Sequence, residues 1–140
     1  MNIIDLPETH FVDAVSLWHE TGLTRPWNDP EVDLRRAVNG SSSTVLAVLG
    51  DEGKLLGTAM VGHDGHRGWV YYLAVRPDYQ GTGLGRRLME ACEAWVSEQD
   101  IPKIQLMVRD TNHKALSFYA ALGYEPASLA VLSRWLTADA

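Results

Sequence analysis

The stretch that decides the fold reads Leu73-Ala-Val-Arg-Pro-Asp-Tyr-Gln-Gly-Thr-Gly-Leu-Gly-Arg-Arg87. It begins as an apolar strand, turns at Pro77, and continues as a glycine-rich loop that opens directly into a helix. Because glycine has no Cβ, the backbone N–H groups of such a loop can approach a ligand closely. The first N–H groups of a helix have no partner within it, and the helix dipole is positive at that end. The stretch therefore predicts an anion site over residues 80–87.

Two cationic side chains favour a bound anion over a plain structural turn, the alternative that stays open. Arg86 and Arg87 lie in the first turn of the expected helix, where a purely structural helix prefers acids. Two nucleotide-binding motifs are excluded. The dinucleotide fingerprint requires a glycine where Arg86 stands, and no Walker sequence occurs.

Outward from this stretch, hydrophobic periodicity predicts alternating strands and helices. We expect helices at residues 8–21, 30–39, 83–99 and 112–122, with Asp29 and Pro30 starting the second. We expect strands at residues 2–6, 44–49, 54–61, 69–75, 103–109, near Tyr124 and at 129–136. The mixture of hairpins and helical crossovers predicts an α/β (α+β) fold with a mixed central sheet of about six to seven strands flanked by about four helices.

Composition and charge narrow the class of protein. A chain of 140 residues fits one domain, residues 1–140, and its net charge of −6 argues against nucleic-acid binding. No apolar run approaches a membrane span, and the acidic amino terminus does not resemble a signal peptide. The single cysteine, Cys92, suits the reducing cytoplasm and lies on an apolar helical pattern as core filler rather than nucleophile. The expected localisation is cytoplasmic, with no membrane partner.

Two motifs carry a family resemblance. Gln80-Gly-Thr-Gly-Leu-Gly85 resembles the Q/R-x-x-G-x-G/A pyrophosphate loop of the GNAT family of N-acetyltransferases. Asn112-x-x-Ala115-x-x-Phe118-Tyr119-x-x-x-Gly123-Tyr124 resembles that family's second signature, in the same order and at the same spacing. The expected elements match the GNAT fold from about residue 3 to residue 136. Residues 25–30 and 62–68 are similar to a small bacterial YpeA-like subgroup.

The resemblance implies acetyl-CoA as co-substrate and assigns residues to it. The backbone of the loop would hold the pyrophosphate, the strand before it would bind the acetyl-pantetheine arm as an added strand, and Asn112 would bond that arm. The alternative for Asn112 is a plain helix N-cap. The implied cofactor-binding residues are Leu73, Ala74, Val75, Gln80, Gly81, Thr82, Gly83, Leu84, Gly85, Arg86, Arg87, Asn112, Ala115, Phe118 and Tyr119.

The same resemblance assigns the chemistry. The Leu73 N–H would polarise the thioester carbonyl and stabilise the oxyanion that forms on attack by an amine. Tyr119 would protonate the departing thiolate, a task that suits a phenol with an ordinary pKa of about 10. Helical spacing turns Tyr119 inward with Ala115 and Leu122, so a packing tyrosine is the alternative.

The general base is where this sequence departs from several relatives. Simple strand alternation puts Trp69, Tyr71, Leu73 and Val75 on one face and Val70, Tyr72 and Ala74 on the other. Relatives carry a glutamate at the position of Trp69, or histidines there and at Tyr71. Here, a water chain past Tyr71, one of Asp29, Glu31, Asp64 and His66, or proton loss to solvent would serve instead.

The acceptor side rests on two loops. Arg25, Trp27, Asn28, Asp29 and Glu31 in the first, with Asp64 and His66 in the second, are the candidate substrate-binding residues. Trp27 would cover an amine by a cation–π contact or anchor its loop. The group His63-Asp64-Gly65-His66 lacks further histidines or cysteines that would complete a tetrahedral set, so we expect no metal.

The sequence therefore predicts an acetyl-CoA-dependent N-acetyltransferase whose acceptor is a small-molecule, peptide or protein amine. One alternative is a non-catalytic acyl-CoA-binding sensor or regulatory module, which the missing base supports. Another is a toxin-type acetyltransferase acting on aminoacyl-tRNA, against which the acidic balance argues. The resemblance makes a homodimer the assembly to test.

Overall fold

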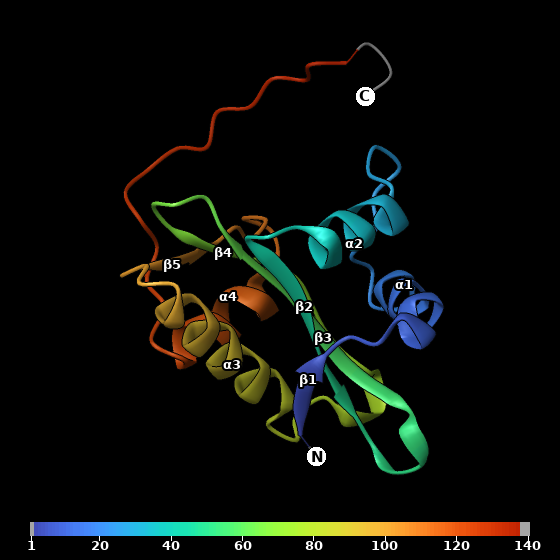
Figure 1. Ribbon diagram of the computed structural model, residues 1–140. Helices are drawn as coiled ribbons and strands as arrows, with labels where there is room; N and C mark the ends of the chain where they lie inside the picture. The colour runs from blue at the N-terminus through green and yellow to red at the C-terminus, as the bar shows by residue number, and fades with distance from the viewer. Residues whose placement is uncertain (1, 138–140) are drawn as a thin grey trace. The chain divides into compact units, whose positions relative to one another are not determined.

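The computed structural model describes residues 2–137, and the chain forms two compact units, Met1–Met107 and Val108–Ala140. The first unit holds the sheet and three α-helices, and the second holds one (Figure 1). Within residues 2–137, no helix combines the length and apolar character that crossing a membrane requires.

A five-stranded mixed sheet forms the centre of the first unit. Its strands lie in the order β1-β2-β3-β4-β5, antiparallel except for the parallel pair of β4 and β5. Their bounds are β1 Ile3–Asp5, β2 Ser43–Leu49, β3 Leu55–His63, β4 Gly68–Val75 and β5 Ile104–Leu106. The mixed α/β class is confirmed, while the strand count falls below the expected six to seven.

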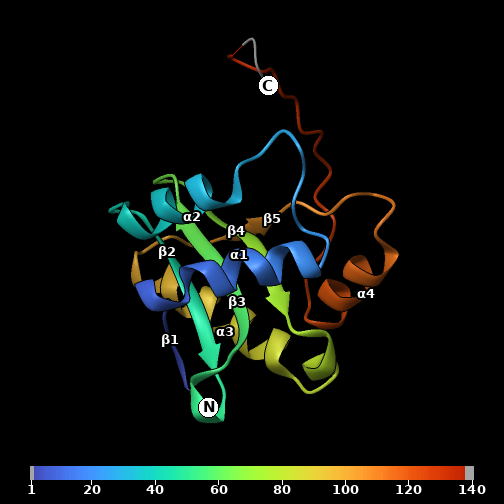
Figure 2. The same cartoon turned by 90° about the vertical axis from the view of Figure 1, so that its right-hand side faces the viewer.

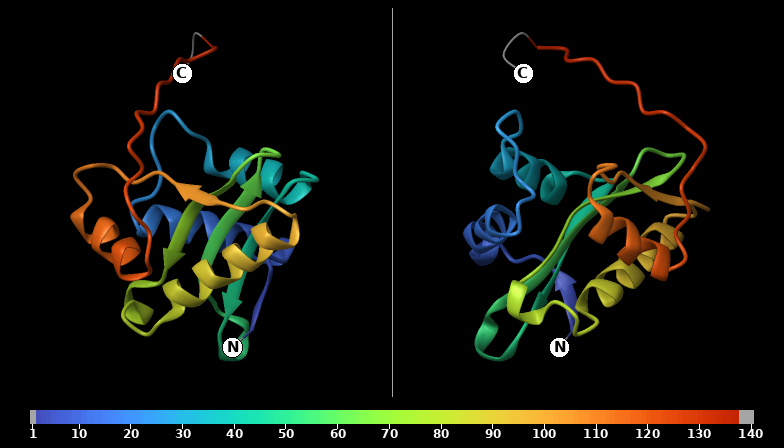
Figure 3. Two further views of the ribbon diagram at one scale, coloured as in Figure 1. Left: turned by 90° about the vertical axis from the view of Figure 1, so that its left-hand side faces the viewer. Right: turned by 180° about the vertical axis from the view of Figure 1, so that it is seen from behind.

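Helices cover both faces of this sheet. The first two helices, α1 (Phe11–Glu20) and α2 (Pro30–Asn39), pack on one face, and α3 (Leu84–Glu98) packs on the other (Figures 2 and 3). Short 3-10 turns lie at Glu8–His10, Asp51–Gly53 and Pro77–Tyr79. The helix start at Asp29 and Pro30 is confirmed: the Asp29 carboxylate caps α2 and Pro30 is its first residue.

Each of the three helices packed on the sheet buries apolar side chains. Trp18 and Leu34 are fully buried in the layer of α1 and α2. On the other face, α3 buries Leu88 and Cys92. Burial, with a smaller contribution from Glu93, raises the pKa of the Cys92 thiol to about 12. A thiol that stays protonated inside the core is filler rather than nucleophile, as expected.

A β-bulge in β4 overturns the simple alternation expected for this strand. Thr58 pairs with Ala74 and Met60 with Tyr71, so two residues of β4, Tyr72 and Leu73, face one residue of β3. Tyr72 has a left-handed φ of 52°. Beyond such an extra residue, each side chain lies on the face opposite to the one that an unbroken alternation would give it.

The alternation therefore changes between Tyr71 and Tyr72. Tyr72 and Ala74 belong to the layer of α1 and α2. Val75 lies on the α3 side, because a Cβ at Gly57 would touch both it and Leu88. The expectation that Trp69, Tyr71, Leu73 and Val75 share one face is wrong, since it assumed an unbroken two-residue period.

The second unit contains α4 (His113–Ala121), which Asn112 caps. After α4, the expected strands near Tyr124 and at residues 129–136 are absent among residues 2–137. Residues 129–136 carry apolar side chains at alternating and adjacent positions, and most are exposed, Leu132 by 92%. A strand forms only where a neighbouring strand accepts its backbone hydrogen bonds, and residues 108–137 of this unit contain no strand that could do so.

Candidate functional site

The glycine loop after β4 leaves its backbone accessible. Gly81 and Gly83 have left-handed φ values of 82° and 90°, and a Cβ at either would meet no atom within 4 Å. Inside the loop, the Thr82 hydroxyl donates to the Tyr79 carbonyl oxygen. The Gln80 side-chain amide donates to the Val75 carbonyl oxygen at 3.1 Å, tying the loop to the end of β4. The space beside Gly81 and Gly83 is therefore open to a ligand, and a side chain at either position would occupy it. We call this loop, with the start of the helix that follows, the cradle.

The start of α3 is suited to an anion. Among the described residues, no side chain caps this helix and no acid lies in its first turn. Arg86 and Arg87, both exposed, occupy that turn instead, while Leu84 is buried and Gly85 is half-buried. The unpaired N–H groups of a helix start and the positive end of its dipole attract negative charge, and the arginines add to it. This arrangement fits the pyrophosphate of a coenzyme A thioester.

The strand before the loop has a free edge beside this cradle. The parallel pairing of β5 with β4 covers Gly68 to Val70 and ends there. Beyond that point Ala74 and Val75 pair with β3, and Leu73 lies in the bulge between paired positions. Such an edge can accept an extended ligand arm as an additional strand. Tyr71 lies at the same stretch with 47% of its surface exposed, and burial of the remainder raises the pKa of its phenol.

A buried polar chain holds the β4 bulge, and sequence reasoning missed it. The Trp18 indole N–H donates to Thr58 Oγ1 at 2.8 Å, and the Thr58 hydroxyl donates to the Tyr72 carbonyl oxygen at 3.1 Å. The Tyr72 hydroxyl donates to Asp33 Oδ2 at 2.7 Å, while its ring stacks on Trp18 with centroids 4.0 Å apart. Burial, with the adjacent Asp33 carboxylate, raises the pKa of Tyr72, so its phenol stays protonated. The one available signal was a threonine inside the apolar run of β3.

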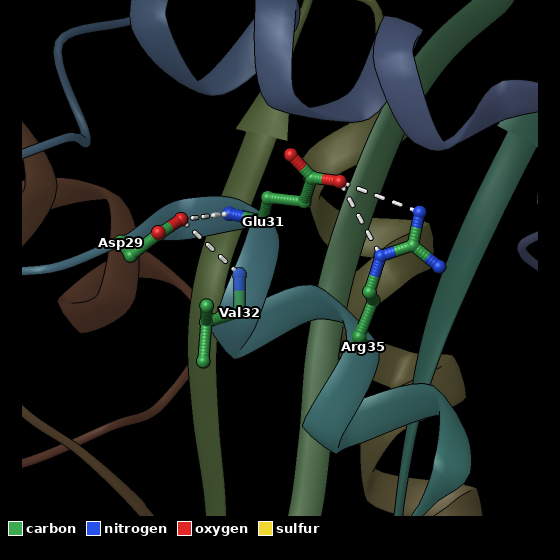
Figure 4. Close-up of polar contacts among 4 residues, drawn as sticks. All are labelled: Asp29, Glu31, Val32 and Arg35. Carbon is green, nitrogen blue, oxygen red and sulfur yellow. Dashed lines mark hydrogen bonds and ion pairs between the residues drawn. The ribbon is translucent and has the colours of Figure 1, made fainter.

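The loop between α1 and α2 and the start of α2 carry five of the acceptor candidates. Asp29 Oδ1 accepts from the backbone N–H groups of Glu31 and Val32 at 3.0 and 3.2 Å (Figure 4). Glu31 pairs with Arg35 at 3.3 Å along the exposed side of the helix. These two carboxylates therefore already have structural partners.

The remaining candidates of this loop differ in exposure. The Arg25 guanidinium donates to the carbonyl oxygens of Gly22 and Thr24, both at 2.8 Å. The Asn28 N–H donates to the Arg25 carbonyl oxygen at 3.1 Å. Trp27 exposes 48% of its surface. Arg25 thus organises the loop, and Trp27 and Asn28 are exposed on it.

The turn between β3 and β4 is organised by its own side chains. Asp64 Oδ1 accepts from the N–H groups of His66 and Arg67 at 2.9 and 2.8 Å, and Asp64 Oδ2 accepts from the Trp69 indole at 3.2 Å. These bonds lower the pKa of Asp64 to about 2, those from the backbone most. A carboxylate with so low a pKa is a weak base at neutral pH. Within residues 2–137, no three His, Cys, Asp or Glu side chains are arranged to hold a metal ion.

The second unit holds the remaining candidates on α4. Asn112 Oδ1 accepts from the Ala115 N–H at 3.1 Å, so the N-cap alternative describes its observed contact. Tyr119 is half-buried, and its ring meets Phe118 and Tyr124 edge-on, with centroids 5.0 and 5.8 Å apart. Tyr119 therefore belongs to a small aromatic cluster with Phe118 and Tyr124.

The structure thus gathers the candidates into separate groups. The residues of β4 and the glycine loop form one, joined by the bond from Gln80 to Val75. The loop before α2 and the turn at Asp64 form two others, each organised by hydrogen bonds to its own aspartate. Asp33, which was not a candidate, links α2 to β4 instead.

Solved structures with this fold are numerous. The tetramutant of the BH1408 protein from Bacillus halodurans is 22% identical, with 96% of this chain and 100% of that chain covered and a TM-score of 0.77. Aminoglycoside N-acetyltransferase AAC(6')-Iy in complex with CoA is 16% identical, with 97% and 95% covered and a TM-score of 0.81. Glucosamine-6-phosphate N-acetyltransferase from Arabidopsis thaliana is 18% identical, with 97% and 98% covered and a TM-score of 0.75. At these identities the likeness shows the fold.

The sequence itself matches a family model. The model of the acetyltransferase (GNAT) family matches residues 12–124, which include the glycine loop and the motif from Asn112 to Tyr124. These comparisons do not test the resemblance to the YpeA-like subgroup, which stays a prediction. A match over most of the chain, with the fold described above, shows that this chain belongs to the GNAT acetyltransferase family.

Proposed function

We propose that this protein, acting as one domain, is an acetyl-CoA-dependent N-acetyltransferase of primary amines. The observation that carries the proposal is the uncapped start of α3, with two arginines and two open left-handed glycines, directly after the free edge of β4. The uncapped helix start with its arginines and glycines suits a pyrophosphate, and the free edge of β4 suits a pantetheine arm. Membership of the GNAT family and the CoA-bound relative support the same ligand.

The reaction requires this chain's residues to stabilise negative charge on the carbonyl oxygen and to protonate the departing sulfur. Acetyl-CoA supplies an acetyl group activated as a thioester. The amine nitrogen bonds to the carbonyl carbon, the carbon–sulfur bond breaks, the amine loses one proton and the departing thiolate gains one. The Leu73 N–H would donate to the carbonyl oxygen as negative charge develops there. Tyr119 would donate the proton to the sulfur.

The acceptor is an amine of a small molecule, a peptide or a protein. An aminoglycoside and glucosamine-6-phosphate are the amines named for two relatives of this fold, and both are small molecules. Arg25, Trp27 and Asn28, with the acids of both acceptor loops, are the proposed substrate contacts. Because the pKa of Asp64 lies near 2, the proposed base is Asp29, Glu31 or His66, or water past Tyr71.

Two measurements test the proposal. Isothermal titration should detect acetyl-CoA binding, and mass spectrometry of a mixed amine library incubated with the protein and acetyl-CoA should detect products heavier by one acetyl group. Binding without any acetylated product would favour the non-catalytic acyl-CoA-binding module, which the absence of a carboxylate or imidazole at Trp69 and Tyr71 supports. Absence of binding would overturn both.

The assignment of Tyr119 as the acid has its own test. Tyr119→Phe keeps the ring and its packing and removes the phenolic proton, so kcat should fall about ten- to a hundredfold while KM for acetyl-CoA stays constant. The alkaline limb of the pH–rate profile should shift or vanish with it. Full kcat with a lower Tm would instead make Tyr119 a packing residue.

A further inference from the structure

The β4 bulge depends on contacts from other elements. Tyr72 has a φ of 52°, in the left-handed region that a bulky residue rarely adopts. Such a conformation persists where surrounding structure holds it in place. Here the surrounding structure is α1 through Trp18, β3 through Thr58 and α2 through Asp33.

The bond from Thr58 decides the orientation of one peptide unit. The Thr58 hydroxyl donates to the Tyr72 carbonyl oxygen, and that carbonyl shares a planar trans peptide with the Leu73 N–H. In a trans peptide the C=O and N–H bonds point in opposite directions. Fixing the carbonyl toward Thr58 therefore directs the Leu73 N–H away from it.

The Trp18 indole determines how the hydroxyl of Thr58 is oriented. Thr58 and Trp18 are both fully buried. Because the Trp18 indole N–H can only donate, it occupies a lone pair of Thr58 Oγ1, and the hydroxyl proton is left for the Tyr72 carbonyl. The direction of the whole chain of bonds, from Trp18 through Thr58 to Tyr72, is thus determined by its first donor.

We propose that Thr58, Trp18, Tyr72 and Asp33 act as positioning residues that hold the peptide between Tyr72 and Leu73 so that the Leu73 N–H faces the reacting carbonyl. The proposal rests on the proposed acetyltransferase function. It goes beyond that function by assigning roles to four residues outside the two family motifs. Asp33 extends the chain of contacts to α2, the helix that the candidate acceptor residue Asp29 caps.

The decisive variant is Thr58→Val, which keeps the side-chain volume and removes both hydrogen bonds. We expect kcat for acetyl transfer, corrected for folded protein, to fall about tenfold or more, because the oxyanion donor is misaligned. The Kd for CoA, which has no acetyl carbonyl, should stay within about twofold. Thr58→Ser keeps the hydroxyl and should restore kcat to within about threefold of wild type.

A matched control is Thr44→Val, also in the sheet. The Thr44 hydroxyl donates to Asp5 Oδ1 at 3.0 Å, a cross-strand bond between β2 and β1. This variant should leave kcat unchanged. A folded Thr58→Val protein with wild-type kcat, or one in which kcat and CoA affinity fall by the same factor, would overturn the proposal.

A spectroscopic readout separates this proposal from the proposed function. In 1H–15N spectra, Thr58→Val should shift the Leu73 amide resonance strongly, whereas Thr44→Val should not. Tyr72→Phe, which loses the Asp33 bond and keeps the ring stack, should shift the same resonance to a smaller extent. If wild-type protein neither binds nor transfers acetyl groups, the proposed function fails and this proposal with it. An unmoved Leu73 resonance in Thr58→Val would sink only the positioning role.

Discussion

The helices α2 and α3 begin in opposite ways, although both follow a loop and both pack on the same sheet. The Asp29 carboxylate caps α2, Pro30 opens it, and two acids follow in its first turn. The helix α3 follows Gly83, which is left-handed, and has no side-chain cap and Arg86 and Arg87 in its first turn.

The difference separates a structural helix start from a binding one. A cap satisfies the free N–H groups from within the chain and complements the dipole with acids, so no ligand is needed. Without a cap, and with cations added, the helix start gains most from an external anion. The second design gives up local stability, since a cap is worth about 1 kcal/mol.

The largest expected effect comes from filling the uncapped start. Gly83→Glu adds a side chain in open space, so no clash prevents folding, but its carboxylate would repel the pyrophosphate. Losing charge-assisted hydrogen bonds and adding repulsion should weaken acetyl-CoA binding by at least about a hundredfold. Isothermal titration of the folded variant measures this.

A matched control exists in the other glycine turn. Gly65 has a φ of 85° and equally open surroundings. Gly65→Glu therefore carries the same charge and the same backbone penalty, about 1–2 kcal/mol for a left-handed residue. It should lower Tm as much as Gly83→Glu does and leave acetyl-CoA binding intact. Equal loss of binding in both variants would contradict the pyrophosphate assignment.

The next effect concerns a third helix start, at α4. Asn112 caps it through Oδ1 and retains an amide group that the proposed function assigns to the pantetheine arm. Asn112→Ser keeps a capping oxygen and removes the amide. We expect an unchanged Tm and a rise of about fivefold in KM for acetyl-CoA, the value of one hydrogen bond. An unchanged KM would leave Asn112 as a cap alone, like Asp29.

These helix starts were predictable because their signals are local. Asp29 with Pro30, and Gly83 with two arginines, lie within a few residues of the structure that they determine. The bulge at Tyr72 was not predictable, because it depends on Trp18, Thr58 and Asp33, which are distant in sequence. The prediction of a strand at residues 129–136 was wrong for a related reason. Alternating apolar residues show that a segment can pair as a strand, but a partner strand must be present for it to do so.

The features of the candidate site were also predictable only where their signals are local in the sequence. The glycine loop was predicted with its open glycines and uncapped helix, since those properties belong to consecutive residues. The faces of β4 were predicted wrongly, because one left-handed residue shifts every later side chain by one position. The low pKa of Asp64 depends on a turn geometry that residue order did not reveal.

A smaller effect should follow from removing the cap of α2. Asp29→Ala should lower the free energy of unfolding by about 1 kcal/mol and Tm by about 3–5 °C, while acetyl-CoA affinity stays constant. Asp29→Ser restores a cap and should restore Tm. If Asp29→Ser has wild-type Tm but loses kcat, Asp29 is the base as well as the cap.

The smallest expected effect belongs to Asp64, whose turn satisfies its own backbone as α2 does. Its pKa is about 2 in the folded protein against an ordinary 3.8, so the ionised form stabilises the fold above about pH 4, and this contribution is lost as the pH falls toward 2. Asp64→Asn should therefore lower Tm slightly at pH 7, and its gap from wild type should close between pH 4 and pH 2. Thermal unfolding across that range tests this, and a constant gap would contradict it. The variant should also keep kcat within about threefold at neutral pH, since a carboxylate this acidic accepts protons poorly. A large loss of kcat would instead make Asp64 the general base, a role that its low pKa argues against.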